Sequence, residues 1–221
     1  MYFLLRYMEL FLNGFILTVI LTVIGLSVGF VIGILTAIGD VYGGKILRIL
    51  INIYVEFFRG SPLVAQLFIF YYSIPTLFNT IVDPFTVGCI VFILNSGAYQ
   101  KGYIKGAIEA VYADQMMAAR SLGLTKWQAI RYVILPQALR ILIPSWTNEF
   151  CSLTKSTSVA IAITLREVTT IAYIVAAQTF RPLETYAFVG LIYFLWIFAV
   201  VKVLDIVYKK VRIPGFGEGV A

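Results

Sequence analysis

The stretch NGFILTVILTVIGLSVGFVIGILTAI, Asn13 to Ile38, decides the fold class of this 221-residue chain. It carries no charged residue, and it exceeds the roughly 20 apolar residues that cross the hydrocarbon of a bilayer. With no water there to bond the backbone, a spanning segment must be a helix or part of a closed barrel, and a long apolar run favours a helix. Glycines recur at positions 25, 29 and 33, which predicts a helix face that another helix approaches closely.

The composition of the whole chain also indicates a membrane protein. It is 61% hydrophobic and 13% charged, with a mean hydropathy of +0.93, against roughly half apolar residues in a soluble domain. Cys89 and Cys151 fall inside apolar segments, so we expect no disulfide. The chain has no His, the commonest metal ligand, and we expect no metal site. The N-terminus lacks the pattern of a cleaved signal peptide, and we expect it to be retained.

Further apolar runs predict the other membrane helices. They cover 63–82, 85–103, 141–163 and 186–201. The run 141–163 has a polar interruption, and a less hydrophobic stretch follows it to Thr179. Before the first of these runs, 47–62 mixes apolar and charged residues and predicts an amphipathic approach helix that ends at Gly60 and Pro62. We therefore predict an all-α integral membrane protein with five transmembrane helices. Its parts are an N-terminal segment 1–12, a membrane domain 13–208 and a tail 209–221.

Lys and Arg residues set the expected orientation. They gather in the connection after the first span, in the long connection 101–140, and after the last span. By the positive-inside rule, these regions and the C-terminus lie in the cytoplasm, and the N-terminus lies outside. The formal net charge of +6 is then explained by inner loops that face anionic lipid. We expect no nucleic acid partner.

The long connection contains a predicted helical hairpin, residues 107–140. Ala107 to Leu122 has apolar positions three and four apart, and Gly123 supplies a left-handed residue that ends a helix. Thr125 with Gln128 forms a capping-box pattern, which starts a second helix that we expect to end before Pro136. Taken alone, such a hairpin fits two roles, resting on the membrane surface or docking a soluble partner.

The sequence of the hairpin, MAARSLGLTKWQAIRYVILPQAL from Met117 to Leu139, resembles the cytoplasmic signature of bacterial and archaeal ABC importer permeases. The family pattern is Glu-Ala-Ala, three residues, Gly, nine residues, then Ile-x-Leu-Pro. The matching positions are Ala118, Ala119, Gly123, Leu135 and Pro136. The chain departs from the pattern at Met117, where the family usually has Glu, and at Val133. FFRGSPLVAQLFIFYY (57–72) and LNSGAYQKGYIKGAIEAV (94–111) resemble the polar amino acid permeases, which serve histidine, arginine, glutamine, glutamate and cystine.

The resemblance implies a type I ABC importer permease fold in the cell membrane of a bacterium or archaeon. Two permease chains, identical or homologous, pair with an ATPase dimer, and an extracytoplasmic binding protein delivers a polar amino acid. The chain lacks a Gly-x-x-x-x-Gly-Lys-Ser/Thr loop, so we expect no enzymatic activity in it and no bound cofactor, with ATP and Mg used by the partner ATPase. The implied coupling residues are Met117, Ala118, Ala119, Arg120, Leu122, Gly123, Leu124 and Pro136.

One polar segment, TNEFCSLTKSTS at 147–158, interrupts the fourth apolar run. On a helix that starts near Ile141, Glu149 lies roughly 12 Å deep and Lys155 roughly 21 Å deep in a core about 30 Å thick. The polar residues at 148, 149, 152, 155 and 156 fall within a sector of about 120°. Because an intramembrane charge costs at least a few kcal/mol, this face must line protein or water. It forms either a buried Glu149 to Lys155 pair or the wall of a substrate cavity.

The cavity interpretation assigns substrate contacts to Asn95, Asn148, Glu149, Ser152, Lys155, Ser156 and Thr157. Glu149 with Asn95 or Asn148 would accept hydrogen bonds from the ammonium of an amino acid, and Lys155 with Ser156 or Thr157 would hold its carboxylate. A helix broken near Lys155 would add free backbone N–H groups. We also expect a hydrogen bond between helices at Gln66.

Charged residues outside this segment have weaker expectations. Arg59 is expected to be a structural anchor at a cytoplasmic helix entrance, and Arg166, Glu167, Arg181 and Glu184 are expected at the outer membrane surface. Two other classes of function fit the chain less well. A stand-alone secondary transporter or channel gives the hairpin no role and usually has paired internal repeats. A membrane enzyme would need a nucleophile with a base in reach, or a metal cluster, which the pattern does not offer.

Overall fold

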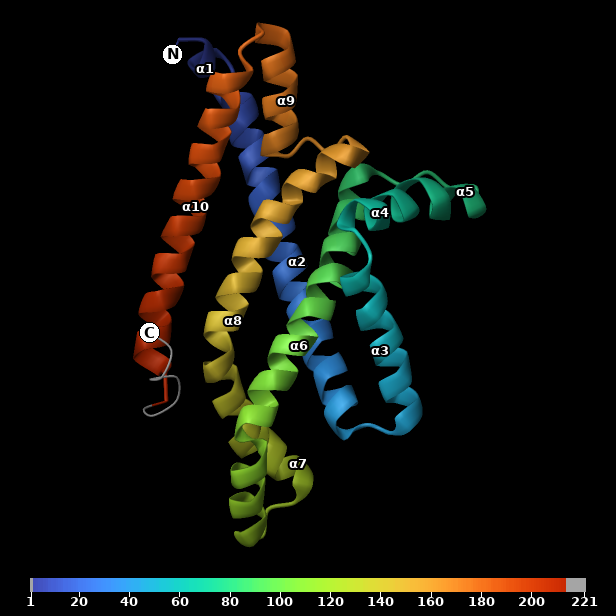
Figure 1. Cartoon of the computed structure of the whole chain (residues 1–221), viewed down its shortest axis with the longest axis vertical. Helices are drawn as coiled ribbons and strands as arrows, with labels where there is room; N and C mark the ends of the chain where they lie inside the picture. Colours follow the sequence, from blue (N-terminus) through green and yellow to red (C-terminus); the bar gives the residue numbers. More distant parts are fainter. Residues whose placement is uncertain (1, 214–221) are drawn as a thin grey trace.

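The structure, a computed structural model, describes residues 2–213 as an elongated bundle of helices, and no strand occurs within that range (Figure 1). The helices are α1 (Tyr2–Arg6), α2 (Met8–Tyr42), α3 (Lys45–Gly60), α4 (Leu63–Phe68), η1 (Ile69–Ser73), α5 (Ile74–Leu77), α6 (Pro84–Ser121), α7 (Lys126–Ala129), η2 (Ile130–Ile134), α8 (Leu135–Ser156), η3 (Thr157–Ile163), α9 (Val168–Thr179) and α10 (Pro182–Val211). Of these, η1 and η2 are π-helical and η3 is a 3₁₀-helix.

The two longest helices, α2 and α6, cross at the centre of the bundle (Figure 1). A Cβ built on Gly29 would lie 3.1 Å from the backbone nitrogen of Gly97, and one built on Gly33 would lie 2.9 Å from Cβ of Gln100. These distances are too short for a larger residue without movement of the helices. The predicted glycine face is therefore confirmed. Beside this crossing, α8 completes an apolar core that includes Leu21, Phe92 and Leu153.

Two helices, α2 and α10, are long and apolar enough to cross a membrane as single elements. Two bent pairs also satisfy the criteria of length and composition: Lys45–Gly60 with Leu63–Leu77, bent by 107°, and Lys126–Ile163 with Val168–Thr179, bent by 53°. If each bent pair is one span, the described residues hold up to four such spans. The expectation of five crossings stays a prediction. The predicted third span lies within α6 and continues into the predicted hairpin without a break.

The run 63–82, predicted as a membrane helix, is helical over only part of its length. Its helical part ends at Leu77, passes through the π turn η1, and runs nearly perpendicular to α3 (Figure 1). The expected approach helix α3 instead packs along α6, with Val55 and Phe58 buried. The break lies at Ser61, whose extended backbone (φ −106°, ψ 146°) is the conformation imposed on a residue that precedes proline.

The long connection has the turn chemistry that the sequence predicts. After α6, Gly123 has φ +83°, and Thr125 and Gln128 form a capping box at the start of α7. The expectation that this second helix ends before Pro136 is wrong, because α7, η2 and α8 run on as one helical path. The π turn η2 directly precedes α8, in which Pro136 is the second residue. Proline lacks a backbone N–H and its ring crowds the preceding turn, and the wider π turn accommodates it.

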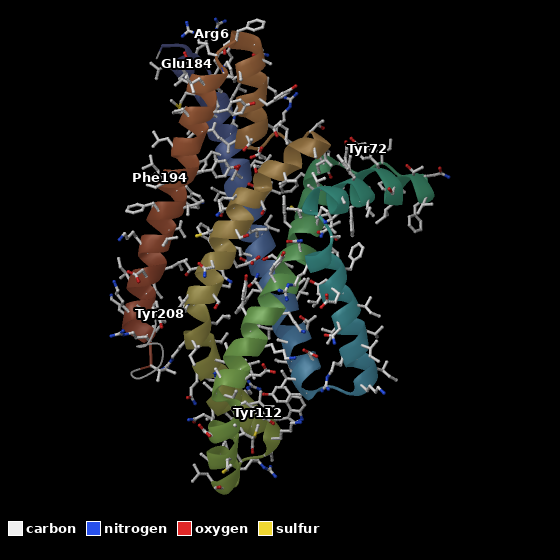
Figure 2. All side chains as sticks on the ribbon, in the orientation of Figure 1. Arg6, Tyr72, Tyr112, Glu184, Phe194 and Tyr208 are labelled. Carbon is white, nitrogen blue, oxygen red and sulfur yellow. The ribbon has the colours of Figure 1, made fainter. Side chains whose placement is uncertain are left out.

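At its other end, α8 tightens into η3 and then stops at Thr164, which has a left-handed backbone (φ 58°). The chain bends there into α9 and returns through α10. The outer side of α10 remains apolar and exposed. Phe194, for example, projects away from the bundle (Figure 2) and is 61% exposed. This side is available to lipid or to another membrane chain.

Candidate functional site

The polar face of α8 places one carboxylate, Glu149, inside the bundle. Glu149 is 3% exposed, and its Oε1 accepts a hydrogen bond of 2.8 Å from Oγ of Ser96 on α6. The ion pairs of the described residues do not include one between Glu149 and Lys155. A buried carboxylate with one short hydrogen bond and no cation is under-satisfied, because a carboxylate can accept about four.

Behind Glu149, a chain of hydrogen bonds joins three helices. Nε2 of Gln100 donates to Oγ of Ser96 at 3.0 Å and to the carbonyl of Leu26 on α2 at 3.0 Å. Nε1 of Trp146 on α8 donates to Oε1 of Gln100 at 3.0 Å. Ser96 and Gln100 therefore hold α2, α6 and α8 in register around Glu149. The sequence reasoning missed both residues, although their spacing of four on an apolar helix marks one polar stripe.

In front of Glu149 lies a cavity of about 120 Å³. The residues that line it are Ser61, Leu63, Asn95, Tyr99, Glu149, Ser152, Leu153 and Ser156. The structure thus brings together four of the predicted substrate contacts: Asn95, Glu149, Ser152 and Ser156. The cavity is smaller than ordinary ligand pockets, which start near ~300 Å³. Within one chain it is therefore too small to enclose an ordinary ligand.

Asn95 reaches the cavity from α6 and also holds the break between α3 and α4. Its Nδ2 donates to the carbonyl of Phe58 at 3.0 Å and to Oε1 of Gln66 at 3.1 Å. Nε2 of Gln66 donates to the same carbonyl at 2.8 Å. The predicted hydrogen bond between helices at Gln66 is confirmed. Oδ1 of Asn95 makes no hydrogen bond within residues 2–213 and can accept one from a ligand.

The structure does not bring the other three predicted contacts to this cavity. Asn148 is exposed and lines a separate cavity of about 380 Å³ between α8 and α10. Thr157 is buried and donates to the carbonyl of Thr154 at 2.8 Å. Lys155 is exposed and is not among the cavity-lining residues. The helix changes type directly after Ser156 but does not break near Lys155, since its break is at Thr164.

A second carboxylate, Glu167, lies at the start of α9, and its expected place at the outer surface is wrong because it is fully buried (0% exposed). Its carboxylate accepts hydrogen bonds from the backbone N–H groups of Thr169 (3.0 Å) and Thr170 (2.7 Å), as a helix N-cap. It also accepts from the hydroxyls of Thr18 (3.4 Å), Thr170 (3.1 Å) and Tyr193 (3.0 Å). Three helices, α2, α9 and α10, meet at this group.

A third buried carboxylate, Asp40, joins α2 to α6. Its Oδ2 lies 2.8 Å from Nζ of Lys101 and 2.9 Å from Nζ of Lys105, and Arg48 donates to its backbone carbonyl at 3.0 Å. Nε of Arg48 also lies 3.7 Å from Oδ1 of Asp40. Three cations around one nearly buried carboxylate (3% exposed) form a satisfied cluster, which fastens these helices near the polar end of α2. The sequence reasoning did not single out Asp40.

Comparison with known proteins identifies the family. Residues 29–213 match the model of the binding-protein-dependent transport system inner membrane component. The chain belongs to this family. It is 35% identical over 161 residues to the glutamine transport system permease protein GlnP of Escherichia coli (strain K12), covering 72% of this chain and 74% of that one. It is 40% identical over 155 residues to the probable amino-acid ABC transporter permease protein PatM of Vibrio harveyi, covering 69% and 70%.

Solved structures agree with this assignment. A crystal structure of an amino acid ABC transporter with histidines matches with a TM-score of 0.87 and 32% identity, over 94% of this chain and 96% of that chain. An inward-facing structure of the methionine ABC transporter MetNI matches with a TM-score of 0.78 and 19% identity, over 94% and 99%. The second match supports the fold alone. The permease is thus an all-helical inner-membrane transport component with the fold of type I ABC importers.

In the permease, the predicted coupling residues other than Pro136 gather at the tip where α6 turns into α7, at the lower end of Figure 1. Several apolar side chains there are exposed: Met117 (71%), Leu122 (81%) and Trp127 (61%). Nη1 of Arg120 donates to the carbonyl of Leu124 at 3.1 Å and closes the turn. Ala119 is buried, and Pro136 lies near the start of α8, away from the turn. Exposed apolar residues on a fixed turn are typical of a docking surface.

Proposed function

We propose that this permease is the membrane subunit of an ATP-driven importer of polar amino acids. The observation that carries the proposal is Glu149, a buried carboxylate without a cation that faces a polar cavity in an ABC permease bundle. An ionisable group inside the membrane that faces a polar cavity marks a substrate pathway. The names of the relatives, which include glutamine and cystine transport permeases, support amino acids as the substrate class.

At the proposed site, Glu149 and Oδ1 of Asn95 accept hydrogen bonds from the ammonium of the amino acid. The hydroxyls of Ser152 and Ser156 lie on the same wall and supply further polar contacts. For the carboxylate the chain offers two cations, Lys155 on α8 and Arg59 on α3. Because the cavity of about 120 Å³ is small, a second permease chain or an opening of the bundle completes the space for a whole amino acid.

The proposed assembly follows the family. Five crossings place the N-terminus outside and the C-terminus in the cytoplasm, as the basic connections favour. Two permease chains, identical or homologous, surround the path, and the tip at 117–124 docks on an ATPase dimer that uses ATP and Mg. A binding protein delivers the amino acid from outside. The permease itself catalyses no reaction.

Reconstitution tests this proposal. The permease is placed in liposomes with and without its ATPase subunit and binding protein, and uptake of radiolabelled L-glutamine, L-histidine, L-arginine and L-cystine is measured with ATP or a non-hydrolysable analogue. We expect uptake of at least one of these amino acids only with the full complex and hydrolysable ATP. Uptake by the permease alone would instead support a secondary transporter or channel, the alternative function.

The docking role of the tip has its own test. Leu122→Asp places a charge on the most exposed apolar residue of the turn without altering Gly123. We expect much less ATPase subunit to co-purify with this variant, while the permease itself remains folded in detergent. The matched control is Leu139→Asp on α8, which is exposed (36%) but lies away from the tip. Equal co-purification from both variants would place the docking surface elsewhere.

A further inference from the structure

Arg59, at the end of α3, is a cation that forms no ion pair among the residues the structure describes. Its guanidinium carbon lies 5.2 Å above the ring centroid of Tyr99 on α6, and a Cβ built on Gly102 would lie 3.6 Å from its Nη1. The ion pairs found within residues 2–213 do not include Arg59. Its side chain is exposed within the single chain and runs along α6, free to meet a ligand.

Arg59 lies at the opposite end of α3 from the basic residues Lys45 and Arg48. The sequence places it at a cytoplasmic helix entrance, and in the structure it lies roughly 21 Å along the helix from Lys45. The preceding carbonyl, that of Phe58, accepts the hydrogen bonds from Asn95 and Gln66, and Figure 1 shows α3 ending beside α6, near the middle of the length of the molecule. A charge at such a depth is costly unless it faces water or a counter-ion.

Arg59 lies next to the cavity that contains Glu149. Tyr99, over which the guanidinium sits, is one wall of that cavity, and Ser61, two residues after Arg59, is another. A cation and a carboxylate therefore flank the same face of α6, and the described residues do not pair either of them with an opposite charge.

We propose that Arg59 binds the carboxylate of the amino acid whose ammonium is received by Glu149. This inference rests on the proposed function and adds the residue that distinguishes an amino acid from a simple amine. A guanidinium offers two parallel N–H donors that match a carboxylate, which a lysine ammonium does not. The ring of Tyr99 keeps the guanidinium in place by a cation–π contact without neutralising it.

The alternative cation, Lys155, would orient the substrate in the opposite direction. Lys155 follows Glu149 by six residues, roughly 9 Å further along α8 and away from the tip at Gly123. Arg59 contacts α6 at Tyr99 and Gly102, on the side of Asn95 that leads toward the tip. With Arg59 as the partner, the carboxylate of the bound amino acid points toward the tip of the hairpin. Neither cation is among the cavity-lining residues, but the guanidinium of Arg59 lies over one of them, Tyr99.

The test measures equilibrium binding to the complete permease and ATPase complex in nanodiscs, without the binding protein, which would select the carboxylate by itself. The probes are the amino acid that the wild-type complex takes up best in the reconstitution above and its α-carboxamide, which keeps the ammonium but lacks the negative charge. The variants are Arg59→Gln, Arg59→Lys, Lys155→Gln and, as matched control on the same helix, Arg48→Gln.

For Arg59→Gln we expect affinity for the amino acid to fall about tenfold or more, the loss typical of a charge-assisted hydrogen bond. Its affinity for the carboxamide should change little, so the preference for acid over amide disappears. Arg59→Lys should keep part of that preference, while Arg48→Gln and Lys155→Gln keep all of it. The inference is overturned if Arg59→Gln retains the wild-type preference, or if Lys155→Gln is the variant that loses it.

Two further outcomes distinguish substrate binding by Arg59 from a structural role and from a failure of the proposed function. If Arg59→Gln separates the two permease chains during size-exclusion chromatography while the acid-to-amide preference is unchanged, Arg59 is a counter-ion for the second chain and the inference is wrong. If the wild-type complex takes up no amino acid at all, the proposed function fails first. The inference and the proposed function are both supported if the wild-type complex transports an amino acid and the Arg59→Gln variant binds the acid and the carboxamide equally well.

Discussion

Glu149 and Glu167 are both buried glutamates in the same membrane bundle, and their surroundings differ completely. Glu167 accepts hydrogen bonds from two backbone N–H groups and three hydroxyls. Glu149 accepts one, from Ser96, and faces a cavity. A buried group whose hydrogen bonds are all made within the chain has no capacity left for a ligand, whereas an under-satisfied group does. Burial alone would have assigned both residues the same role, and the count of donors separates them.

The largest expected effect is on transport by Glu149→Gln. The amide oxygen still accepts from Ser96, so the fold and the assembly with the ATPase should persist, but the negative charge is lost. We expect uptake to fall by about tenfold to a hundredfold, as charge-assisted hydrogen bonds of ~1.5–3 kcal/mol are weakened. Initial rates of uptake in proteoliposomes measure this. Normal uptake by the variant would remove Glu149 from the site.

The next effect is on stability, from Glu167→Ala. The change removes the N-cap of α9 and one acceptor from each of the hydroxyls of Thr18 and Tyr193, which keep contacts with the carbonyl of Gly14 and the hydroxyl of Thr169. We expect a loss of about 2–4 kcal/mol in stability, read as a lower midpoint of thermal unfolding in detergent. Transport per assembled complex should be retained at low temperature. A variant that unfolds normally but does not transport would show that Glu167, like Glu149, serves the substrate path.

A smaller effect should follow from Ser96→Ala, which removes the one donor to Glu149 found in the structure. Without it, the carboxylate is oriented less firmly and Gln100 loses an acceptor. We expect KM for the amino acid to rise by roughly threefold to tenfold, the equivalent of one hydrogen bond of ~0.5–1.5 kcal/mol. The measurement is the dependence of uptake rate on substrate concentration. An unchanged KM would mean that Ser96 does not position Glu149.

The smallest effect should follow from Thr170→Val, which removes one of the donors to Glu167 and keeps the shape of the side chain. The other four donors remain, so we expect a loss of less than ~1 kcal/mol and no change in transport. Thermal unfolding beside the wild-type protein measures it. A loss as large as that of Glu167→Ala would mean that the cluster acts as one unit whose members cannot be removed singly.

The sequence predicts the features that depend on neighbours along the chain. The glycine face at positions 25, 29 and 33, the left-handed Gly123 and the capping box at Thr125 all follow from short patterns, and the structure has each of them. The sequence also points to Glu149 and Asn95, because charged and amide groups are rare at such depth in a membrane helix.

The features that the sequence did not predict depend on contacts between distant residues. Glu167 looks like a surface residue beside Arg166, but its partners Thr18 and Tyr193 lie 149 and 26 residues away. The stop at Pro62 was predicted, yet the 107° bend after it depends on packing against α6 and on Asn95. The continuation of the helix past Pro136 requires a π turn, which no local pattern in this sequence marked.

The crossing of α2 and α6 has a mechanical consequence. Because Gly29 and Gly97 let the two backbones touch, α6 can pivot at this contact. It is one continuous helix that extends beyond the contact in both directions. If the ATPase docks on the tip as proposed and displaces it near Ser121, roughly 36 Å from Gly97, the opposite end of α6 at Pro84 must move in the opposite direction. Asn95 is two residues from Gly97, so a rotation about this contact would move it little. Access to the cavity could thus change on both sides of the membrane while the groups proposed to bind the substrate stay together.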